Sequence, residues 1–366
     1  MKIAIISRAW FTEVKGGAER YIYEIAKELI YRGYIVTTIS QNISDLPNRH
    51  IKISVGRIPL ITSGISSLLF GIIAQLSNIE FILVNGYWAE FAPLLIKKPW
   101  VLIIHDVALF RSERIQRNKL KHLLRKVFLA KVVRRAKKII VPSKLTYEDL
   151  RKFLGVEKEK LEIVPEGIDI YKFKRNRCTS DGVFRIVQIG RFDPNKGQNI
   201  LIDAFKKIMK KHQNVELYLI GSILKMYIKY YNYLIKISSG YNNILFKTNI
   251  EDEELLNYLN QADLCVFPSL GEEGWGLAVG EAFACQVPVI CSEIYFKTGI
   301  ADESRALLAP TNPEGLAEKI LWAMEHRDFM ERLALNGYKY IQGLSWKKTT
   351  EMILKIMEKV TESQAD

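Results

Sequence analysis

Two carboxylates stand among glycines between two apolar runs, in the segment 263–292 with the sequence DLCVFPSLGEEGWGLAVGEAFACQVPVICS. Glu273 and Glu281 are separated by seven residues. Three glycines surround the first carboxylate: Gly271, Gly274 and Gly276. Glycines let a backbone approach a ligand closely, and a helix that begins near Leu277 would point its N-terminal amides at that ligand. We expect Glu273 to reach ligand hydroxyls, and Glu281 to accept from a diol, as an acidic residue does from a ribose.

Two cations follow an earlier apolar run, in the segment 184–205 with the sequence FRIVQIGRFDPNKGQNILIDAF. Arg191 comes directly after the run, and Lys196 precedes a helical pattern. One guanidinium and one ammonium at such a turn suit two adjacent phosphates. The spacing is not that of a P-loop, G-x-x-x-x-G-K-[ST], which disfavours an ATPase. Taken alone, the segment is explained equally well by two solvated surface cations.

The N-terminal part offers two weaker signals. Gly16 and Gly17 precede a helical pattern, where backbone amides can bind an anion, although the spacing is not G-x-G-x-x-G and a plain loop also explains them. His105 and Asp106 end an apolar run, and a histidine there can hydrogen-bond a polar ligand or exchange protons near neutral pH. On these residues alone, a loop histidine with ordinary partners is the simpler explanation.

Secondary-structure elements must position these residues. Along the chain, short apolar runs alternate with longer amphipathic stretches. The runs lack strict alternation, which is typical of strands buried on both faces of a parallel sheet. The first half contains seven such runs: 2–7, 34–40, 51–55, 81–86, 100–106, 137–143 and 161–167. The second half contains six: 184–190, 215–221, 243–248, 263–269, 288–292 and 306–310. Ligands of such sheets bind at the carboxyl ends of the strands, near which the candidate residues lie.

A polar segment without periodicity, 171–183, separates the two series of runs. We therefore predict an α/β protein with two doubly wound domains, 1–172 and 173–345. The stretch 345–360 is helical in pattern and no strand follows it. We expect a C-terminal helix at residues 346–366 to pack back on the first domain.

Length and composition agree with this division. The chain has 366 residues, of which 48% are hydrophobic and 25% charged, which excludes disorder, collagen-like repeats and a disulfide scaffold. Its cysteines form no C-x-x-C pair, which argues against a zinc ribbon or a redox motif. We expect buried thiols of a reducing cytosol at the four positions Cys178, Cys265, Cys285 and Cys291.

An uncharged stretch of 22 residues, 58–79, is long enough to span a bilayer. It contains Pro59, Thr62, Gln75 and several serines, so we favour a helix packed under a sheet over a membrane span. A surface that dips into the membrane is the intermediate alternative. The N-terminal apolar run is short and no small-residue cleavage site follows, so we expect no signal peptide.

The net charge of +13 is unevenly distributed. Residues 1–175 carry 31 Lys and Arg against 16 Asp and Glu, a net charge of +15, and the remainder has a net charge of −2. The segment from Arg111 to Ile140 alone holds 12 Lys and Arg and one acid. Its apolar residues recur near helical spacing, which predicts a basic amphipathic helix suited to an anionic membrane surface. A core-packed helix with a basic solvated face explains the segment equally well.

In this order the motifs resemble those of retaining, nucleotide-sugar-dependent glycosyltransferases of family four (glycosyl transferases group 1), which have the GT-B fold. The resemblance covers nearly the whole chain, through GGAER, HD, VPS, PEGID, IGRFDPNKG, LYLIG, PSLGEEGWGLAVGEAFA and PVICS. Its specific part is the pair of glutamates seven residues apart. The resemblance implies two Rossmann-like domains that face each other across a cleft, with the nucleotide sugar bound mostly by the C-terminal domain.

For the C-terminal domain, the resemblance implies that Arg191 and Lys196 neutralise the diphosphate. Glu281 would bind the nucleotide ribose, and Glu273 the hydroxyls of the transferred sugar. Backbone amides of four consecutive residues would contact phosphate or sugar: Gly274, Trp275, Gly276 and Leu277. The physical reason is that departure of a nucleoside diphosphate develops negative charge, which fixed cations and amides stabilise.

For the N-terminal domain, the resemblance implies that Gly16 and Gly17 close over the diphosphate and that His105 touches the donor sugar. In this family, retention is explained by front-face attack with the leaving phosphate as the base. No protein nucleophile, metal ion or other cofactor is therefore expected. The expected catalytic set is His105, Arg191, Lys196 and Glu273.

Three places depart from the family pattern. Glu166 stands where Asn is common, and Gln286 stands where Gly is usual. The segment 295–304, YFKTGIADES, replaces a Gly-Gly turn. This last change falls near the sugar end of the expected site, so the identity of the sugar is left open.

These observations predict a cytoplasmic enzyme that transfers a hexose from a UDP or GDP sugar to a glycan or lipid-linked acceptor. We expect peripheral contact with the inner face of an anionic membrane through the basic segment 111–140. An epimerase of the same architecture is the alternative, although the order of the two glutamates favours a transferase. A nucleic-acid-binding protein is less favoured, because the basic segment lacks the aromatic residues on which bases stack.

Overall fold

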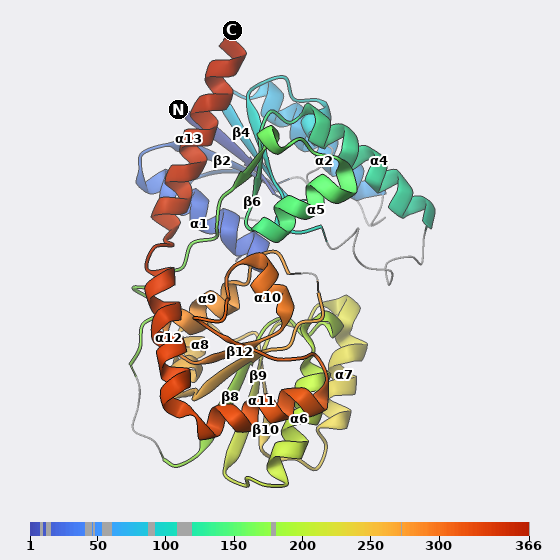
Figure 1. Cartoon of the computed structure of the whole chain (residues 1–366). Helices are drawn as coiled ribbons and strands as arrows, with labels where there is room; N and C mark the ends of the chain where they lie inside the picture. The colour runs from blue at the N-terminus through green and yellow to red at the C-terminus, as the bar shows by residue number, and fades with distance from the viewer. Residues whose placement is uncertain are drawn as a thin grey trace. The chain divides into compact units, whose positions relative to one another are not determined.

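The computed structural model describes the whole chain except residues 8–9, 12–15, 41–45, 47, 53–60, 87–91, 108–118, 177–180, 272 and 366. The chain forms two compact units, both drawn in Figure 1. The first consists of Met1–Gly167 and Trp346–Asp366, and the second of Ile168–Ser345. The junction thus lies at residue 167, slightly before the boundary expected at 172, and the C-terminal helix belongs to the first unit.

A parallel sheet of seven strands forms the centre of the first unit, in the order β3-β2-β1-β4-β5-β6-β7. Its strands are β1 (Lys2–Ile6), β2 (Ile35–Ser40), β3 (Arg49–Lys52), β4 (Phe81–Asn85), β5 (Trp100–Ile103), β6 (Ile139–Val141) and β7 (Leu161–Ile163). Every residue of β5 and β6 is buried, which explains why these runs show no alternation of polar and apolar residues.

Helices cover both faces of this sheet (Figure 1), with α1 and α13 on one side and α2, α4 and α5 on the other. They are α1 (Gly17–Tyr31), α2 (Ile61–Leu76), α4 (Lys119–Arg135), α5 (Lys144–Leu154) and α13 (Trp346–Ala365), with short 3₁₀ turns η2 (Ala92–Leu94) and η4 (Lys158–Lys160). Arg32, directly after α1, lies 2.8 Å from Glu28 and 3.1 Å from Glu351 of α13. This ion-pair network joins the C-terminal helix to α1.

The uncharged stretch forms α2, whose Phe70 and Ala74 are buried in the core beside the sheet. Residues 58–60 lie outside the described part of the chain. In the described part, no helix is both long enough and apolar enough to cross a membrane. The described side chains of α2 thus include core-packed residues, in agreement with the packed helix that the sequence favoured.

The basic segment forms α4, although residues 111–118 are not described. In the described part of this helix, Leu129, Val132 and Val133 are buried in the core, while Lys131 and Arg134 are exposed. The described turns of α4 are thus a core-packed helix with a basic solvated face, which is one of the two alternatives for this segment.

The second unit has a parallel sheet of six strands in the order β10-β9-β8-β11-β12-β13. The strands are β8 (Phe184–Ile189), β9 (Val215–Gly221), β10 (Ile244–Thr248), β11 (Leu264–Phe267), β12 (Val289–Cys291) and β13 (Leu307–Leu308). The helices are α6 (Gln198–Met209), α7 (Ile228–Ile237), α8 (Asp252–Gln261), α9 (Leu277–Ala284), α10 (Glu293–Thr298), α11 (Pro313–Glu325) and α12 (Arg327–Ile341), with 3₁₀ turns η5 (Pro194–Lys196) and η6 (Lys225–Tyr227).

Both sheets are doubly wound, so the prediction of two Rossmann-like α/β folds is confirmed. In each sheet the strand order reverses beside the first strand, between β1 and β4 and between β8 and β11. Ligands of open parallel sheets bind at this switch point, beyond the carboxyl ends of the strands. The loops that follow these four strands are therefore the places to look for a site.

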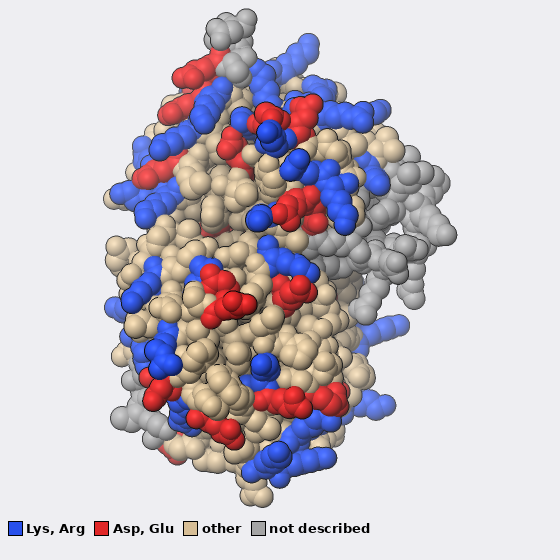
Figure 2. Space-filling model, viewed as in Figure 1, with Lys and Arg blue, Asp and Glu red and all other residues tan. Residues whose placement is uncertain are grey.

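The two units differ in surface charge. On the face drawn in Figure 2, Lys and Arg side chains are prominent over the first unit, and charges of both signs are mixed over the second. This agrees with the sequence, in which the first unit has a net charge of +13 and the second a net charge of zero.

Candidate functional site

The loop after β8 turns sharply so that Lys196 lies at the switch point of the second unit. The side chain of Asp193 accepts from the backbone N–H of Asn195 at 2.9 Å and so caps the η5 turn. Gly197 follows with a φ of +67°, and a Cβ there would overlap the carbonyl oxygen of Pro268. Glycine is required at this position because it alone allows both the left-handed backbone and the close approach.

This loop is joined to the loop after β11 by two hydrogen bonds. The side-chain amide of Asn195 donates to the carbonyl of Gly271 at 2.6 Å, and the N–H of Leu270 donates to the carbonyl of Asn195 at 2.8 Å. The two loops that carry the predicted cation and carboxylate are thereby held side by side.

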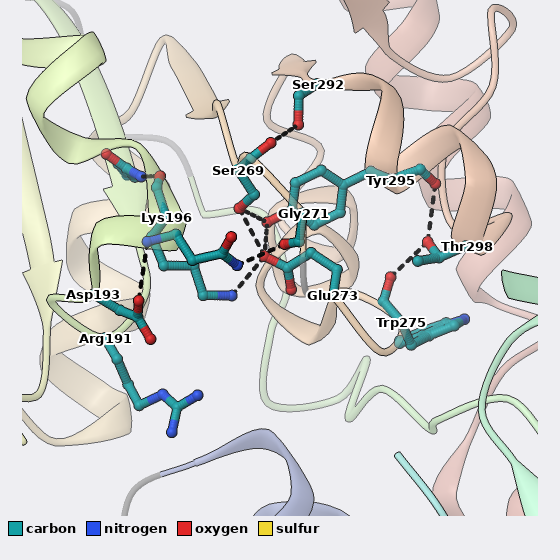
Figure 3. A network of polar contacts seen from close by, with 12 residues as sticks. Arg191, Asp193, Lys196, Ser269, Gly271, Glu273, Trp275, Ser292, Tyr295 and Thr298 are labelled. Atoms are coloured by element: carbon teal, nitrogen blue, oxygen red, sulfur yellow. Dashed lines mark hydrogen bonds and ion pairs between the residues drawn. The ribbon is translucent and has the colours of Figure 1, made fainter. Parts of the chain in front are cut away.

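Lys196 and Glu273 form an ion pair in which Nζ lies 2.6 Å from Oε1 (Figure 3). The same carboxylate oxygen accepts from the hydroxyl of Ser269 at 2.7 Å and from that of Tyr295 at 2.9 Å. The Glu273 side chain is only 7% exposed. All three donors use Oε1, and no described residue donates to Oε2, so the second oxygen can accept from a ligand hydroxyl.

Tyr295 and Ser269 are further neighbours of Glu273, and the sequence motifs did not point to them. Burial, and then the charge of Glu273, raise the pKa of Tyr295 well above its ordinary value, so the phenol stays protonated and donates. Ser292 donates to the carbonyl of Ser269 at 2.6 Å, and Thr298 donates to the carbonyl of Trp275 at 2.8 Å. One sequence feature could have pointed to Tyr295, because this residue belongs to the segment 295–304, which departs from the family pattern.

The glycine-rich loop ends at Gly276, which has a φ of +121° and precedes the first residue of α9, Leu277. The helix thus begins where the sequence predicted. Backbone N–H groups at a helix N-terminus can bind an anion, and in α9 they belong to the residues from Gly276 onward. The side chain of Trp275 is buried, so only the backbone of that residue is available to a ligand. Glu281 is buried on α9 and only 5% exposed.

Arg191 is not part of the ion-pair cluster. Its side chain is exposed, and Figure 3 shows the guanidinium turned away from Lys196 and Glu273. Its carbonyl accepts from the side-chain amide of Gln198 at 2.8 Å, which fixes the backbone of the loop. The structure thus brings together two of the four residues expected to act in catalysis, and places Arg191 on the same loop as Lys196.

In the first unit, three polar residues at the carboxyl ends of neighbouring strands contact one another. The Nε2 atom of His105 lies 2.7 Å from Oδ1 of Asn85, whose amide nitrogen donates to the hydroxyl of Ser7 at 3.2 Å. The Nδ1 atom of His105 lies 3.8 Å from Oε1 of Glu166. Both ring nitrogens therefore face protein groups in this structure.

Gly16 and Gly17 lie at the N-terminus of α1, with Gly16 as the N-cap and Gly17 as the first helical residue. Residues 12–15, which precede them, lie outside the described part of the chain. The helix N-terminus that the sequence predicted is present, and binding of an anion there stays a prediction.

The described cysteines are buried free thiols: Cys265, Cys285 and Cys291. Burial raises the pKa of Cys285 to about 12 and that of Cys265 well above its ordinary value. Within the described residues, no group of three or more His, Cys, Asp or Glu side chains could hold a metal ion. The fourth cysteine, Cys178, lies outside the described residues, and independence from metal stays a prediction.

Comparison with known protein families gives two matches that together cover most of the chain. Residues 15–172 match the family described as Glycosyltransferase Family 4. Residues 171–340 match the family described as Glycosyl transferases group 1. The two matches meet close to the junction between the two units.

Among curated proteins, the chain is similar to an uncharacterized glycosyltransferase, MJ1178, of Methanocaldococcus jannaschii. The two are 31% identical over 176 residues, which is 48% of either chain. A phosphatidyl-myo-inositol mannosyltransferase of Mycobacterium tuberculosis is 23% identical, over 100% of this chain and 98% of its own.

Among solved structures, a sucrose-phosphate synthase from Thermosynechococcus elongatus aligns with a TM-score of 0.83 and 21% identity, over 99% of both chains. Anabaena Alr3699/HepE in complex with UDP-glucose aligns with a TM-score of 0.81 and 19% identity, over 98% of this chain and 100% of its own. At identities this low, the likeness to these structures shows the shared fold alone.

Proposed function

The chain belongs to the glycosyltransferases of family four (glycosyl transferases group 1) with the GT-B fold, and from this premise we propose that it transfers a hexose from a nucleoside diphosphate sugar with retention of configuration. The observation that carries the proposal is the ion pair between Lys196, which is partly exposed, and the buried Glu273, at the switch point of the second unit. A glycine-rich loop and the N-terminus of α9 follow it directly.

The second unit supplies the groups that a donor needs. Loss of a nucleoside diphosphate develops negative charge, which the Lys196 ammonium and the amides at the start of α9 would stabilise. Arg191 is exposed and unconstrained by the cluster, so it can turn toward a phosphate when one binds. The second oxygen of Glu273 would accept from a sugar hydroxyl, and Glu281 would accept from the ribose.

We propose a uridine or guanosine diphosphate as the leaving group. The structure of Alr3699/HepE with UDP-glucose supports this choice, because a chain of the same fold holds such a donor. The proposal requires no metal ion, since Lys196, Arg191 and backbone amides carry the positive charge that the leaving group needs.

We further propose that the acceptor is a glycan or a lipid-linked sugar, bound by the first unit at the cytoplasmic face of a membrane. A similar chain is named for transfer to phosphatidyl-myo-inositol, which is a lipid acceptor. The net charge of +15 in residues 1–175 would favour an anionic membrane surface. Within the first unit, Gly16 and Gly17 would contact a phosphate and His105 a sugar hydroxyl.

A thermal-shift panel of UDP, GDP and ADP with their sugars tests the donor. A ligand at 100 times its Kd adds about 2.7 kcal/mol to the apparent stability, so the correct nucleotide raises Tm measurably. Glu281→Gln should abolish the shift, because the ribose loses its charged acceptor. Glu253→Gln, at an exposed position on α8 in the same unit, should retain it. If no nucleotide raises Tm, or if Glu281→Gln responds like the parent chain, the donor assignment fails.

Sedimentation with vesicles tests the membrane proposal separately. The chain should bind vesicles rich in anionic lipid at low salt and be released as salt screens the charges. Neutral vesicles are the control. Absence of binding to anionic vesicles at low salt would rule out the membrane contact and leave the donor assignment untouched.

A further inference from the structure

The short helix α10 and its N-cap residue bind the glycine-rich loop of the second unit through side chains. Three buried hydroxyls donate to the loop: Ser292 to the carbonyl of Ser269 at 2.6 Å, Tyr295 to Oε1 of Glu273 at 2.9 Å, and Thr298 to the carbonyl of Trp275 at 2.8 Å. Each of the three donors is at most 3% exposed. A loop rich in glycine has many backbone conformations, so these three contacts restrict it.

Tyr295 is the only one of these three donors that reaches a side chain of the loop. Its ring lies against Phe267 of β11, with 5.9 Å between the centroids. On another side the ring packs under Gly276, where an added Cβ would lie 3.0 Å from Cδ1 of the ring. Burial raises the pKa of Tyr295 well above its ordinary value, so the phenol keeps its proton. The hydroxyl of Tyr295 is therefore a donor at a fixed position.

The hydroxyl protons at Glu273 can be assigned by counting. The hydroxyls of Ser269 and Tyr295 lie 2.9 Å apart, and each also lies within 2.9 Å of Oε1 of Glu273. Each hydroxyl has one proton, so the two protons serve only two of these three contacts. A carboxylate is a stronger acceptor than a neutral hydroxyl, so both protons are donated to Oε1. Lys196 is the third donor to the same oxygen (Figure 3).

The two oxygens of the Glu273 carboxylate thus differ. Three donors hold Oε1, and they come from the loop after β8, the loop after β11 and helix α10. No residue that the structure describes donates to Oε2. Rotation of the carboxylate would break all three contacts to Oε1, so Oε2 is an acceptor with a fixed position and direction.

We propose that Tyr295 is a positioning residue for recognition of the transferred sugar. By holding Oε1 of Glu273, it fixes Oε2 at the place where a sugar hydroxyl donates. Because Tyr295 is buried, it acts through Glu273 and not by contact with the ligand. An acceptor that is fixed before binding loses less conformational freedom when the ligand arrives, which favours the nucleotide sugar over the bare nucleotide. The role rests on the sugar transfer proposed above.

The sequence indicates that this arrangement belongs to this chain. Tyr295 and Thr298 lie in the segment 295–304, which stands where the family pattern has a Gly-Gly turn. Glycine has no side chain, so a Gly-Gly turn cannot donate such a hydrogen bond to Glu273. Side chains of α10 therefore organise the part of the loop that carries the proposed sugar acceptor.

Titration calorimetry of the full chain tests the role of Tyr295, with UDP and UDP-glucose as one pair of ligands and GDP and GDP-mannose as the other. The quantity compared is the Kd of the nucleotide divided by the Kd of its sugar. Tyr295→Phe keeps the ring and removes only the hydroxyl. It should lower this ratio by about tenfold, because the acceptor of the sugar hydroxyl is no longer fixed. The Kd of the nucleotide alone should not change.

A double-mutant cycle separates positioning from a general effect on the loop. Glu273→Ala removes the acceptor and should also lower the ratio. In the Glu273→Ala background, Tyr295→Phe should have no further effect, because the hydroxyl acts only through the carboxylate. Tyr218→Phe is the matched control. The Tyr218 hydroxyl donates to Glu216 at 2.8 Å on β9, so its removal also breaks a tyrosine–glutamate hydrogen bond but should leave the ratio unchanged.

The outcomes distinguish this role from the proposed function. An unchanged ratio in Tyr295→Phe, or a further fall in the Glu273→Ala background, would overturn the role of Tyr295 and leave the donor assignment in place. An unchanged ratio in Glu273→Ala would overturn it as well, since the carboxylate would not recognise the sugar. If the parent chain binds neither nucleotide, the donor assignment itself fails, and the role of Tyr295 fails with it.

Discussion

The two units place a buried carboxylate near the same point of the same fold but give it different partners. In the second unit, Glu273 accepts three hydrogen bonds at one oxygen, all within 2.9 Å. In the first unit, Glu166 faces the ring of His105 at 3.8 Å. The strand order fixes where such a group can lie, and the loops decide what it can do.

The unit with the excess of positive charge is not the unit that contains the Lys196–Glu273 ion pair. The first unit carries 32 Lys and Arg against 19 Asp and Glu, a net charge of +13, and the second carries 21 of each. The ion pair that suits a diphosphate nevertheless lies in the nearly neutral unit, because Lys196 is placed there by its loop. Net charge therefore describes the surface that a partner approaches, while the proposed donor site depends on the positions of a few side chains.

The first prediction uses the cysteines, all of which lie in the second unit, to follow that unit alone. Burial raises the pKa of Cys285 from 9.0 to about 12, so its reactive thiolate is about 10³-fold rarer near pH 8 than in an unfolded chain. In a Cys178→Ser background, alkylation should be slowed by that factor in the folded protein. The thiolate returns as pH rises toward 12 or as the unit unfolds.

Mass spectrometry after a timed pulse of iodoacetamide measures this protection. Labelling along a urea gradient is compared with the fluorescence of a chain that keeps only Trp10 and Trp100 of its six tryptophans, both in the first unit, and shows whether the two units unfold together. Rapid labelling of Cys285 in the native protein near pH 8 would contradict the buried state described here.

The second prediction removes the cation of the donor cluster. Lys196→Ala should lower the rate of transfer from a nucleotide sugar by about 10²–10³-fold, because the leaving diphosphate loses a fixed charge. The measurement is kcat/KM with a competent acceptor. Lys206→Ala is the control. Lys206 lies on α6 in the same unit and forms an ion pair with Asp203 at 3.1 Å. Equal losses in both variants would show that the placement of Lys196 is not what matters.

Local patterns predicted the fold of both units well. Continuous apolar runs predicted buried parallel strands, because the sheet has helices on both faces and needs no polar side. The glycines before Leu277 predicted the start of α9, because a loop pressed against a helix N-terminus needs residues without a Cβ. Such signals lie within a few residues of the feature that they predict.

Contacts between distant segments could not be predicted in this way. The bond from Tyr295 to Glu273 depends on how α10 packs against the loop after β11, and nothing near either residue encodes it. The pairing of Glu166 with His105 joins residues 61 positions apart through the sheet. The direction of Arg191 depends on the rotamer of a long exposed side chain, which its neighbours in sequence do not restrict.

The third prediction tests whether the hydroxyl of Tyr295, as the third donor to Glu273, stabilises the second unit. Tyr295→Phe removes the hydroxyl that lies 2.9 Å from Glu273 and should lower the free energy of unfolding by about 1–2 kcal/mol. Lys196 and Ser269 still satisfy the carboxylate, so the loss stays moderate. Urea unfolding measures it. Tyr171→Phe, at a side chain that is 86% exposed, should change nothing. Unchanged stability of Tyr295→Phe would mean that the third donor is redundant.

The fourth prediction concerns a strained backbone position in the second unit. Gln286 has a φ of +51°, in the left-handed region, and it stands where glycine is usual in the family. A non-glycine residue there costs about 1–2 kcal/mol, while glycine adds about 0.5–1 kcal/mol of unfolded-chain entropy. The hydrogen bond from Arg175 to the Gln286 side chain, at 3.3 Å, is exposed and contributes little.

Gln286→Gly should therefore raise the free energy of unfolding by about 0.5–1 kcal/mol, with Gln286→Ala, which keeps the Cβ, as the control. The gain should appear in the urea transition of the second unit, which is monitored by cysteine labelling. It should be absent from the transition of the first unit, where the described part of the chain has no non-glycine residue of positive φ. If Gln286→Gly were less stable than the parent chain, the Gln286 side chain would contribute more stability than its left-handed backbone costs.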